Sequence, residues 1–162
     1  VDRILPIFLP IESDKYIGMA GTAVRTLMRC VDSEVYPGKA VIVSNVAADN
    51  AAIQKMEGSP SVTCGMAGSG DGLLYAASVF GQEEFPEVNE DALDAIGELL
   101  NCINGLYASS VSKEGTSLEL LPPEFKTGIK EVSGKEMLVL PVYMNGGCLN
   151  FLVSVDDDIE IK

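Results

Sequence analysis

The chain has 162 residues, of which 47% are hydrophobic and 22% are charged, and these proportions suit one ordinary globular domain with a real core. Eleven basic and twenty-four acidic residues give a formal net charge of -13, so the protein's own field would repel a nucleic-acid backbone. No apolar run reaches the roughly 20 residues that span a bilayer, and the start, VDRILPIFLPIESDK, lacks the pattern of a signal peptide. We therefore expect a cytoplasmic protein that binds neither nucleic acid nor membrane.

The cysteines and the missing histidine limit the chemistry further. Cys30, Cys64, Cys102 and Cys148 occur singly in apolar stretches, without a C-x-x-C pair, so we expect buried reduced thiols and neither a disulfide nor a zinc site. The chain contains no histidine, which removes Ser-His-Asp and Cys-His catalysis together with the commonest general base near neutral pH.

The first half of the chain is expected to contain a helix, three strands and a shorter helix. Residues 1–12 are an N-terminal extension of uncertain structure. Apolar residues at helical spacing predict a helix over about 13–31. The strands are KAVIVSN, NAAIQKMEG and SVTCGMAG, the last two joined as a hairpin by the turn EGSPS, and a short helix follows over 71–80.

The second half begins with a long helix. Asn89 is a good N-cap, and Glu90 and Asp91 suit the positive first turn, so we expect a helix from Asn89 to about Ser110. A short strand TSLELL, a loop through Pro122 and Pro123, and the strands MLVLPVYM and CLNFLVSV follow. Asn145-Gly146-Gly147 predicts a tight turn between the last two strands. The end, DDDIEIK, is interpreted as a solvated tail.

This order of elements, a helix followed by three strands, occurs twice. It predicts an α/β (α+β) pseudo-symmetric sandwich, in which two helix-plus-three-strand halves form a sheet covered by long helices. We interpret residues 1–162 as one domain, with 156–162 as its tail.

One face of the long helix is unusual for a plain solvent surface. The apolar positions expected to pack on the sheet are Leu93, Ile96, Leu99, Leu100, Ile103, Leu106 and Tyr107. Asp94, Glu98, Asn101 and Gly105 share a line on the other side. An ordinary solvated face explains the acids, but glycine inside a helix costs about 1 kcal/mol relative to alanine and asparagine is a mediocre helix former.

Another protein lying along this line would explain both residues. Gly105 permits close approach of a backbone, Glu98 offers a carboxylate to a basic group, and Asn101 offers a donor and an acceptor. An amide is no general base near neutral pH, yet it can hold a water molecule in line with a phosphoryl group, as glutamine does in GTPases.

At these residues the chain resembles the CheC/CheX/FliY chemotaxis phosphatases. Asp94, Glu98 and Asn101 match the family's spacing, and Pro123 follows after twenty-one intervening residues, one short of the family pattern. The segments AAIQKMEGSPSVTCGMAG and FGQEEFPEVNEDALDAIGELLNCINGLYAS are also similar, and the resemblance extends over about 38–155. The first helix, KYIGMAGTAVRTLMRCV, has no E-x-x-N, so the CheX type with a single site is the nearest pattern.

The resemblance implies a phosphatase that hydrolyses the phosphoaspartate of a CheY-like response-regulator receiver domain. Asn101 would position the water and Glu98 would contact the receiver's lysine, with Asp94, Gly105 and Pro123 at the partner surface. The receiver would supply Mg²⁺, so this chain would bind no metal or cofactor of its own, and CheX-type proteins are homodimers. The alternative is a CheX-like docking or dimerisation module in two-component signalling that lacks catalytic activity.

Two departures from the family pattern are Asn104, where a small residue is usual, and Leu106, where a polar one is usual. Asn104 lies toward the edge of the apolar stripe, so we expect it to be structural.

Other motifs have simpler structural explanations. Gly65, Gly68, Gly70 and Gly72 in CGMAGSGDGLL miss the spacing of a phosphate loop and suit a tight strand-to-helix turn. Ser109, Ser110 and Ser112 have no basic partner to activate them. Asp156, Asp157 and Asp158 lack the surroundings of a calcium loop.

Overall fold

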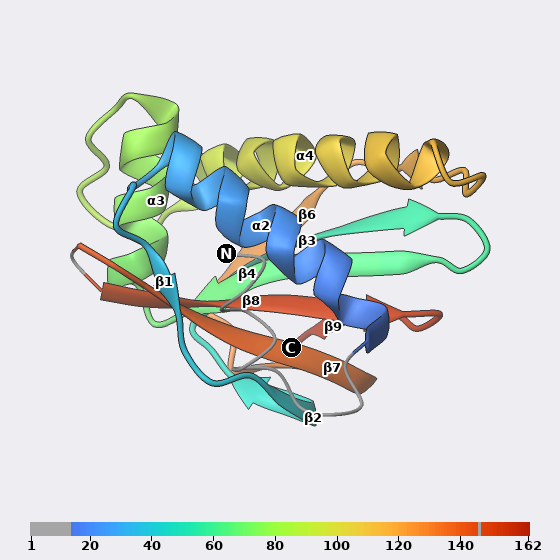
Figure 1. Ribbon diagram of the computed structural model, residues 1–162. Coiled ribbons are helices and arrows are strands. Elements are labelled where there is room, and N and C mark those ends of the chain that lie inside the picture. The colour runs from blue at the N-terminus through green and yellow to red at the C-terminus, as the bar shows by residue number, and fades with distance from the viewer. Residues whose placement is uncertain (1–13, 146) are drawn as a thin grey trace.

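The computed structural model describes residues 14–145 and 147–162, in which three α-helices cover one face of an antiparallel sheet (Figure 1). The N-terminal extension and Gly146 of the predicted turn lie outside these residues. The elements, in chain order, are η1 (Asp14–Tyr16), α2 (Ile17–Cys30), β1 (Tyr36–Pro37), β2 (Val41–Ala47), β3 (Asn50–Glu57), β4 (Val62–Gly68), α3 (Asp71–Gly81), α4 (Glu90–Ser112), β5 (Glu119–Leu120), β6 (Glu124–Thr127), β7 (Glu131–Met144), β8 (Gly147–Val155) and β9 (Glu160–Ile161).

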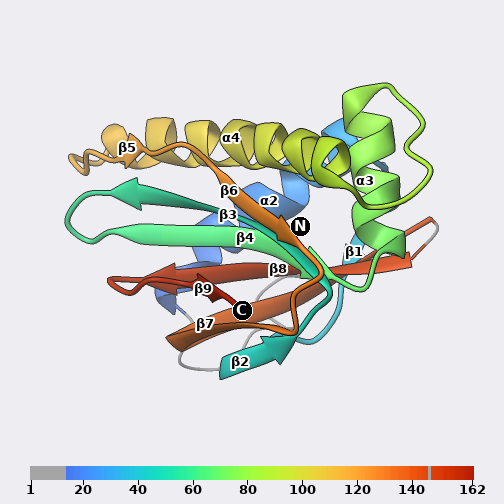
Figure 2. The same cartoon turned by 180° about the vertical axis from the view of Figure 1, so that it is seen from behind.

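The predicted pseudo-symmetric arrangement is confirmed. β4 and β8 pair at the centre of the sheet, β3 flanks β4, and β7 flanks β8. β2 of the first half pairs with β7, while β6 of the second half pairs with β3, so each half contributes a strand beside the other half. This exchange carries the loop before β6 alongside α4, as Figure 2 shows.

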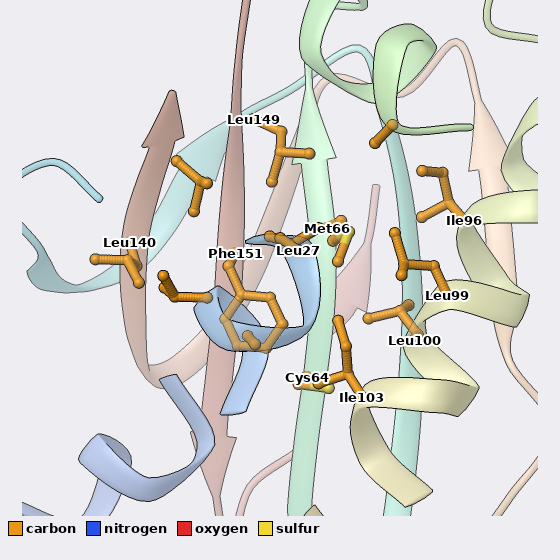
Figure 3. Packing of buried hydrophobic residues seen from close by; sticks show 14 of the residues in the cluster. Leu27, Cys64, Met66, Ile96, Leu99, Leu100, Ile103, Leu140, Leu149 and Phe151 are labelled. Carbon is orange, nitrogen blue, oxygen red and sulfur yellow. The ribbon is translucent and has the colours of Figure 1, made fainter. Parts of the chain in front are cut away.

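The main core lies between the helices and the sheet (Figure 3). Alternation along β8 directs Phe151 and Val153 toward the helices and Leu152 toward the opposite face, where a second, smaller apolar cluster forms. Leu27 of α2 and Leu100 of α4 are both fully buried against the same sheet. Among the described helices, none has the length and apolar character needed to cross a bilayer.

The predicted solvated tail at 156–162 is wrong. Ile159 is buried in the second cluster, and β9 pairs with β7 through Val132 and Ile161. Asp157 accepts hydrogen bonds from the backbone N–H groups of Lys135 and Glu136, at 2.6 and 3.3 Å. Hydrogen bonds from backbone N–H groups and strand pairing therefore hold this segment against the sheet, although its charges predicted a solvated tail.

Three short strands were not expected from the sequence. β1, β6 and β9 have two to four residues each and gain their conformation from pairing with β7 or β3. The longer elements agree with the sequence-based boundaries to within a few residues, apart from β7, which begins six residues before the predicted MLVLPVYM.

Candidate functional site

The exposed line on α4 is present in the structure. The helix starts after Asn89, whose side chain accepts a hydrogen bond from the N–H of Ala92 at 2.9 Å. Asp94, Glu98 and Asn101 are all exposed. Gly105 is exposed too, and a Cβ added to it would meet no atom within 4 Å. The described part of the chain thus leaves this ridge of α4 open to a partner.

The apolar side of α4 packs as expected except at its end. The side chains of Leu93, Ile96, Leu99, Leu100 and Ile103 are fully buried. Leu106, also expected to pack on the sheet, is 48% exposed, and Tyr107 is half-buried. Leu106 lies at the margin of the apolar stripe, beyond the part of the helix surface that the sheet covers.

Asn101 is exposed but is also held from below. Gln54 of β3 is 1% exposed, and its Nε2 donates to Asn101 Oδ1 at 2.9 Å and to the Leu121 carbonyl oxygen at 2.8 Å. The Asn101 amide is therefore joined to the strand beneath the helix and to the loop beside it. Asn101 therefore does not lie wholly on the side of α4 away from the core, where the helical spacing placed it.

The hydrogen-bonded chain continues into the core through Asn104. Its Nδ2 donates to Gln54 Oε1 at 2.7 Å, and its Oδ1 accepts from Cys64 Sγ at 2.8 Å. Burial raises the pKa of the Cys64 thiol to about 12, so the sulfur keeps its proton at neutral pH and acts as a donor. Asn104 is fully buried and structural, as predicted.

Pro123 lies against the same helix. A Cβ added to Gly97 would come within 3.2 Å of Pro123 Cβ, so the glycine allows the loop and the helix to pack closely. This contact is one residue from Glu98, and it brings Pro123 to the side of the exposed ridge. Pro123 itself is half-buried.

A shallow hollow of about 360 Å³ opens beside Glu98, between α3 and α4. Phe80, Phe85 and Ala95 provide its apolar lining, and carboxylates rim it. The rim residues are Glu83, Asp91, Asp94 and Glu98. Glu98 forms no ion pair with any residue in 14–145 or 147–162, which leaves its carboxylate available to a basic group of another molecule.

A family model described as "Chemotaxis phosphatase CheX" matches residues 50–142, which is more than half of the chain and includes Glu98 and Asn101. The chain belongs to the CheX family. No curated protein sequence matches it.

Solved structures share the fold of this CheX-family chain. A CheC-like superfamily protein from Shewanella sp. PV-4 has a TM-score of 0.76 at 16% identity, and the alignment covers 90% of this chain and 99% of that one. The chemotaxis protein CheX from Desulfovibrio desulfuricans has a TM-score of 0.72 at 16% identity, covering 86% and 97%. The CheX in a CheX-CheY-BeF3-Mg²⁺ complex from Borrelia burgdorferi has a TM-score of 0.67 at 18% identity, covering 88% and 97%.

Within the described residues, no group of three or more Cys, Asp or Glu side chains is arranged to hold a metal ion. The four cysteines are free, but the expectation that all are buried is wrong: only Cys64 is buried, Cys30 and Cys148 are half-buried, and Cys102 is exposed on α4. Partial burial, with Cys30 and Glu98 nearby, raises the pKa of the Cys102 thiol and keeps it neutral.

The glycines between β4 and α3 form the predicted tight turn. Gly70 has a φ of 139°, which only glycine adopts readily. A Cβ at Gly72 would lie 2.4 Å from the carbonyl carbon and oxygen of Cys148, so this glycine lets α3 approach β8. Close packing explains the glycine-rich segment.

Sequence reasoning missed Gln54, although a signal was present. In NAAIQKME, alternation places Ala52, Gln54 and Met56 on the same face of β3, and the other two are fully buried. A polar residue in the middle of an apolar row needs a hydrogen-bonding partner, because burying an amide without one is costly. Only the folded chain reveals that Asn101 and Asn104 are its partners.

Proposed function

We propose that this chain is a phosphatase that hydrolyses the phosphoaspartate of a CheY-like receiver domain. Asn101 positions the attacking water, and Glu98 pairs with the receiver's active-site lysine. The observation that carries this proposal is the joint exposure of Glu98 and Asn101, three residues apart on one ridge of α4, in a chain of the CheX family.

The Asn101 amide suits a water-positioning role because it is both reachable and anchored. Gln54 occupies one lone pair of Oδ1, which leaves the second lone pair and the Nδ2 hydrogens for external groups. An amide with a fixed orientation can accept from a water while donating to a phosphoryl oxygen. A freely rotating side chain would first have to be ordered.

The charges around Glu98 favour a basic partner surface. Glu98 and Asp94 belong to the acidic rim of the hollow between α3 and α4, and the apolar lining could receive a small side chain of the partner. Opposite charges speed encounter and fix register across an interface. A lysine that faces a receiver's phosphorylation site would meet such a carboxylate.

The reaction needs few groups from this chain. The water oxygen forms a bond to phosphorus, and the bond between phosphorus and the aspartyl oxygen breaks. The products are an aspartate carboxylate and dihydrogen phosphate, which carries both hydrogens of the water. Mg²⁺ is assigned to the receiver, and it would neutralise charge on the phosphoryl oxygens when bound there.

The test is phosphate release from a phosphorylated CheY-like receiver with Mg²⁺, in the presence of this protein. Asn101→Ala should lower the rate constant by roughly 10² to 10³, because it removes one preorganised contact of the transition state. The matched control is Asn45→Ala, the same change at an exposed residue of β2, a strand at the opposite edge of the sheet from β6, and it should leave the rate unchanged.

Two results would contradict the proposal. If Asn101→Ala hydrolyses the phosphoreceiver as fast as the wild type, Asn101 does not position the water. If the wild type binds the phosphorylated receiver in titration calorimetry but never accelerates phosphate release, the chain is a docking module.

A further inference from the structure

We propose that Gln54 is a positioning residue for this site: from beneath α4 it fixes which end of the Asn101 amide faces the partner. This inference rests on the proposed function and extends it to a buried strand residue. It depends on the polar chain that runs from Cys64 through Asn104 and Gln54 to Asn101 and Leu121.

The Leu121 carbonyl determines the direction of the hydrogen bonds along this polar chain, and the Cys64 end agrees with it. At one end, the carbonyl oxygen of Leu121 can only accept, so the Gln54 atom facing it is Nε2. At the other end, the protonated Cys64 thiol donates to Asn104 Oδ1, so Asn104 Nδ2 faces Gln54 Oε1. The Leu121 end requires this orientation of the Gln54 amide, and the hydrogen bonds at the Cys64 end agree with it.

That orientation fixes Asn101 in turn. Because Gln54 Nε2 donates its second hydrogen to Asn101, the Asn101 atom facing inward is Oδ1. Nδ2 is directed away from Gln54, and no described group accepts from it. An exposed asparagine without this anchor would rotate among its rotamers and present either atom.

A purely structural role for Gln54 makes a different prediction. Outside this polar chain, the buried α4 residues that face the sheet are apolar, with Ile96, Leu99 and Leu100 fully buried, so the helix has ample packing without the Gln54 amide. If Gln54 only joined the helix to β3, its loss would lower stability and would leave the catalytic rate of the folded protein unchanged. The positioning role predicts a specific loss of rate.

The experiment replaces Gln54 with methionine, which has a similar length but no donor. With the phosphorylated receiver as substrate, Gln54→Met should lower kcat about 10- to 100-fold, as misplacement of a reacting group does, while KM stays within about twofold because Glu98 is untouched. The control is Ser154→Ala, which removes a buried hydrogen bond to the Glu136 carbonyl on the opposite face of the sheet. It should lower the melting temperature without lowering kcat.

A double mutant separates positioning from general damage. In the Asn101→Ala background, Gln54→Met should cause no further loss of kcat, because the group that Gln54 orients is gone. An additional 10-fold loss in that background would overturn the inference.

Gln54→Glu adds a pH signature. The ionised carboxylate can only accept, so it cannot hold Asn101 Oδ1, whereas the protonated acid can donate to it. Burial raises the pKa of the introduced carboxyl, so kcat relative to wild type should recover as the pH falls from 8 to 5.5. A flat ratio across this range would contradict the positioning role.

An NMR measurement of the Asn101 side-chain amide does not depend on catalysis, so it tests this inference separately from the proposed function. In ¹⁵N-labelled protein, the side-chain NH₂ signals of Asn101 are identified by their absence in Asn101→Ala. They should shift and exchange faster with water in Gln54→Met than in Ser154→Ala. Unchanged signals would show that Gln54 does not hold the amide, even if Asn101 is catalytic. Shifted signals in a protein without phosphatase activity would refute the proposed function and leave the anchoring intact.

Discussion

α2 and α4 lie on the same face of the sheet and both bury an apolar stripe against it. They differ in the charged residues that they expose and in the sheet residues that lie beneath them. α2 exposes Arg25 and Arg29, whereas α4 exposes Asp94 and Glu98. The buried residues that β7 and β8 contribute to the main core, among them Leu140 and Phe151, are apolar. β3 instead places Gln54 under α4, where it bonds to Asn101. Shared packing stabilises both helices, and α4 in addition joins an exposed amide, Asn101, to a buried amide of the sheet.

This contrast shows where a pseudo-symmetric fold can become functionally asymmetric. Many substitutions at exposed positions of either helix should be tolerated, because the solvent-facing side of a helix contributes little to stability. The specific element is a polar residue in the sheet that fixes an exposed amide. One helix of the pair can therefore hold a site while the other remains scaffold.

Among the differences between the two helices, the largest effect on receiver binding is expected from reversing the charge on α4. Glu98→Lys should raise the dissociation constant for the phosphorylated receiver by about tenfold or more, since it places like charges across the interface. Glu34→Lys, the same change at an exposed residue just after α2, should have little effect. Titration calorimetry at low and high salt measures both. Equal effects of the two variants would mean that α4 is not the contact surface.

A smaller effect is expected at the N-terminus of α4. The Asn89 side chain caps this helix, whereas Tyr16, the residue before α2, makes no side-chain capping hydrogen bond. Asn89→Ala should reduce the free energy of unfolding by about 1 kcal/mol. Chemical denaturation measures the loss, and Asn45→Ala should remain within about 0.5 kcal/mol of wild type. If both variants are equally stable, the cap does not stabilise α4.

The smallest effect concerns the buried thiol at the base of the polar chain. Burial raises the pKa of Cys64 above its unfolded value, so its contribution to stability is complete below the unfolded pKa and falls as pH rises toward the folded one. Between pH 8 and 9.5 the folded thiol stays protonated while the unfolded one ionises. The wild type should therefore lose roughly 1 kcal/mol or less relative to Cys64→Ala in this window. Chemical denaturation at several pH values measures the free energy of unfolding of both proteins. Equal changes in this free energy between pH 8 and 9.5 would contradict a buried, protonated thiol.

The parts of the fold that depend on local spacing could be predicted from the sequence. The Asn89 cap, the exposed line through Glu98 and Asn101, and the hairpin between β3 and β4 all follow from patterns within one or two elements. Leu106 could not be placed correctly, because a helical wheel gives a direction but not the width of the sheet beneath it. β9 was missed because its pairing partner, β7, is distant in the sequence.

The anchoring of Asn101 could not be predicted for the same reason. Gln54 and Asn101 are separated by 47 positions, and the strand residue gives no sign of which helical residue it will contact. The family resemblance identified the exposed groups, which recur at a fixed spacing on one helix. It said nothing of the residues that orient them from another element.

The margin of the sheet beside α4 has a further consequence. There β3 is flanked by β5, with two residues, and β6, with four, and Pro122 and Pro123 interrupt the chain between them. Because these strands are short and are separated by prolines, few consecutive backbone N–H groups are free to pair with a strand of another molecule. Edge-to-edge association of sheets at this margin is therefore disfavoured. The exposed ridge of α4 beside it can stay accessible to a partner without promoting fibril formation.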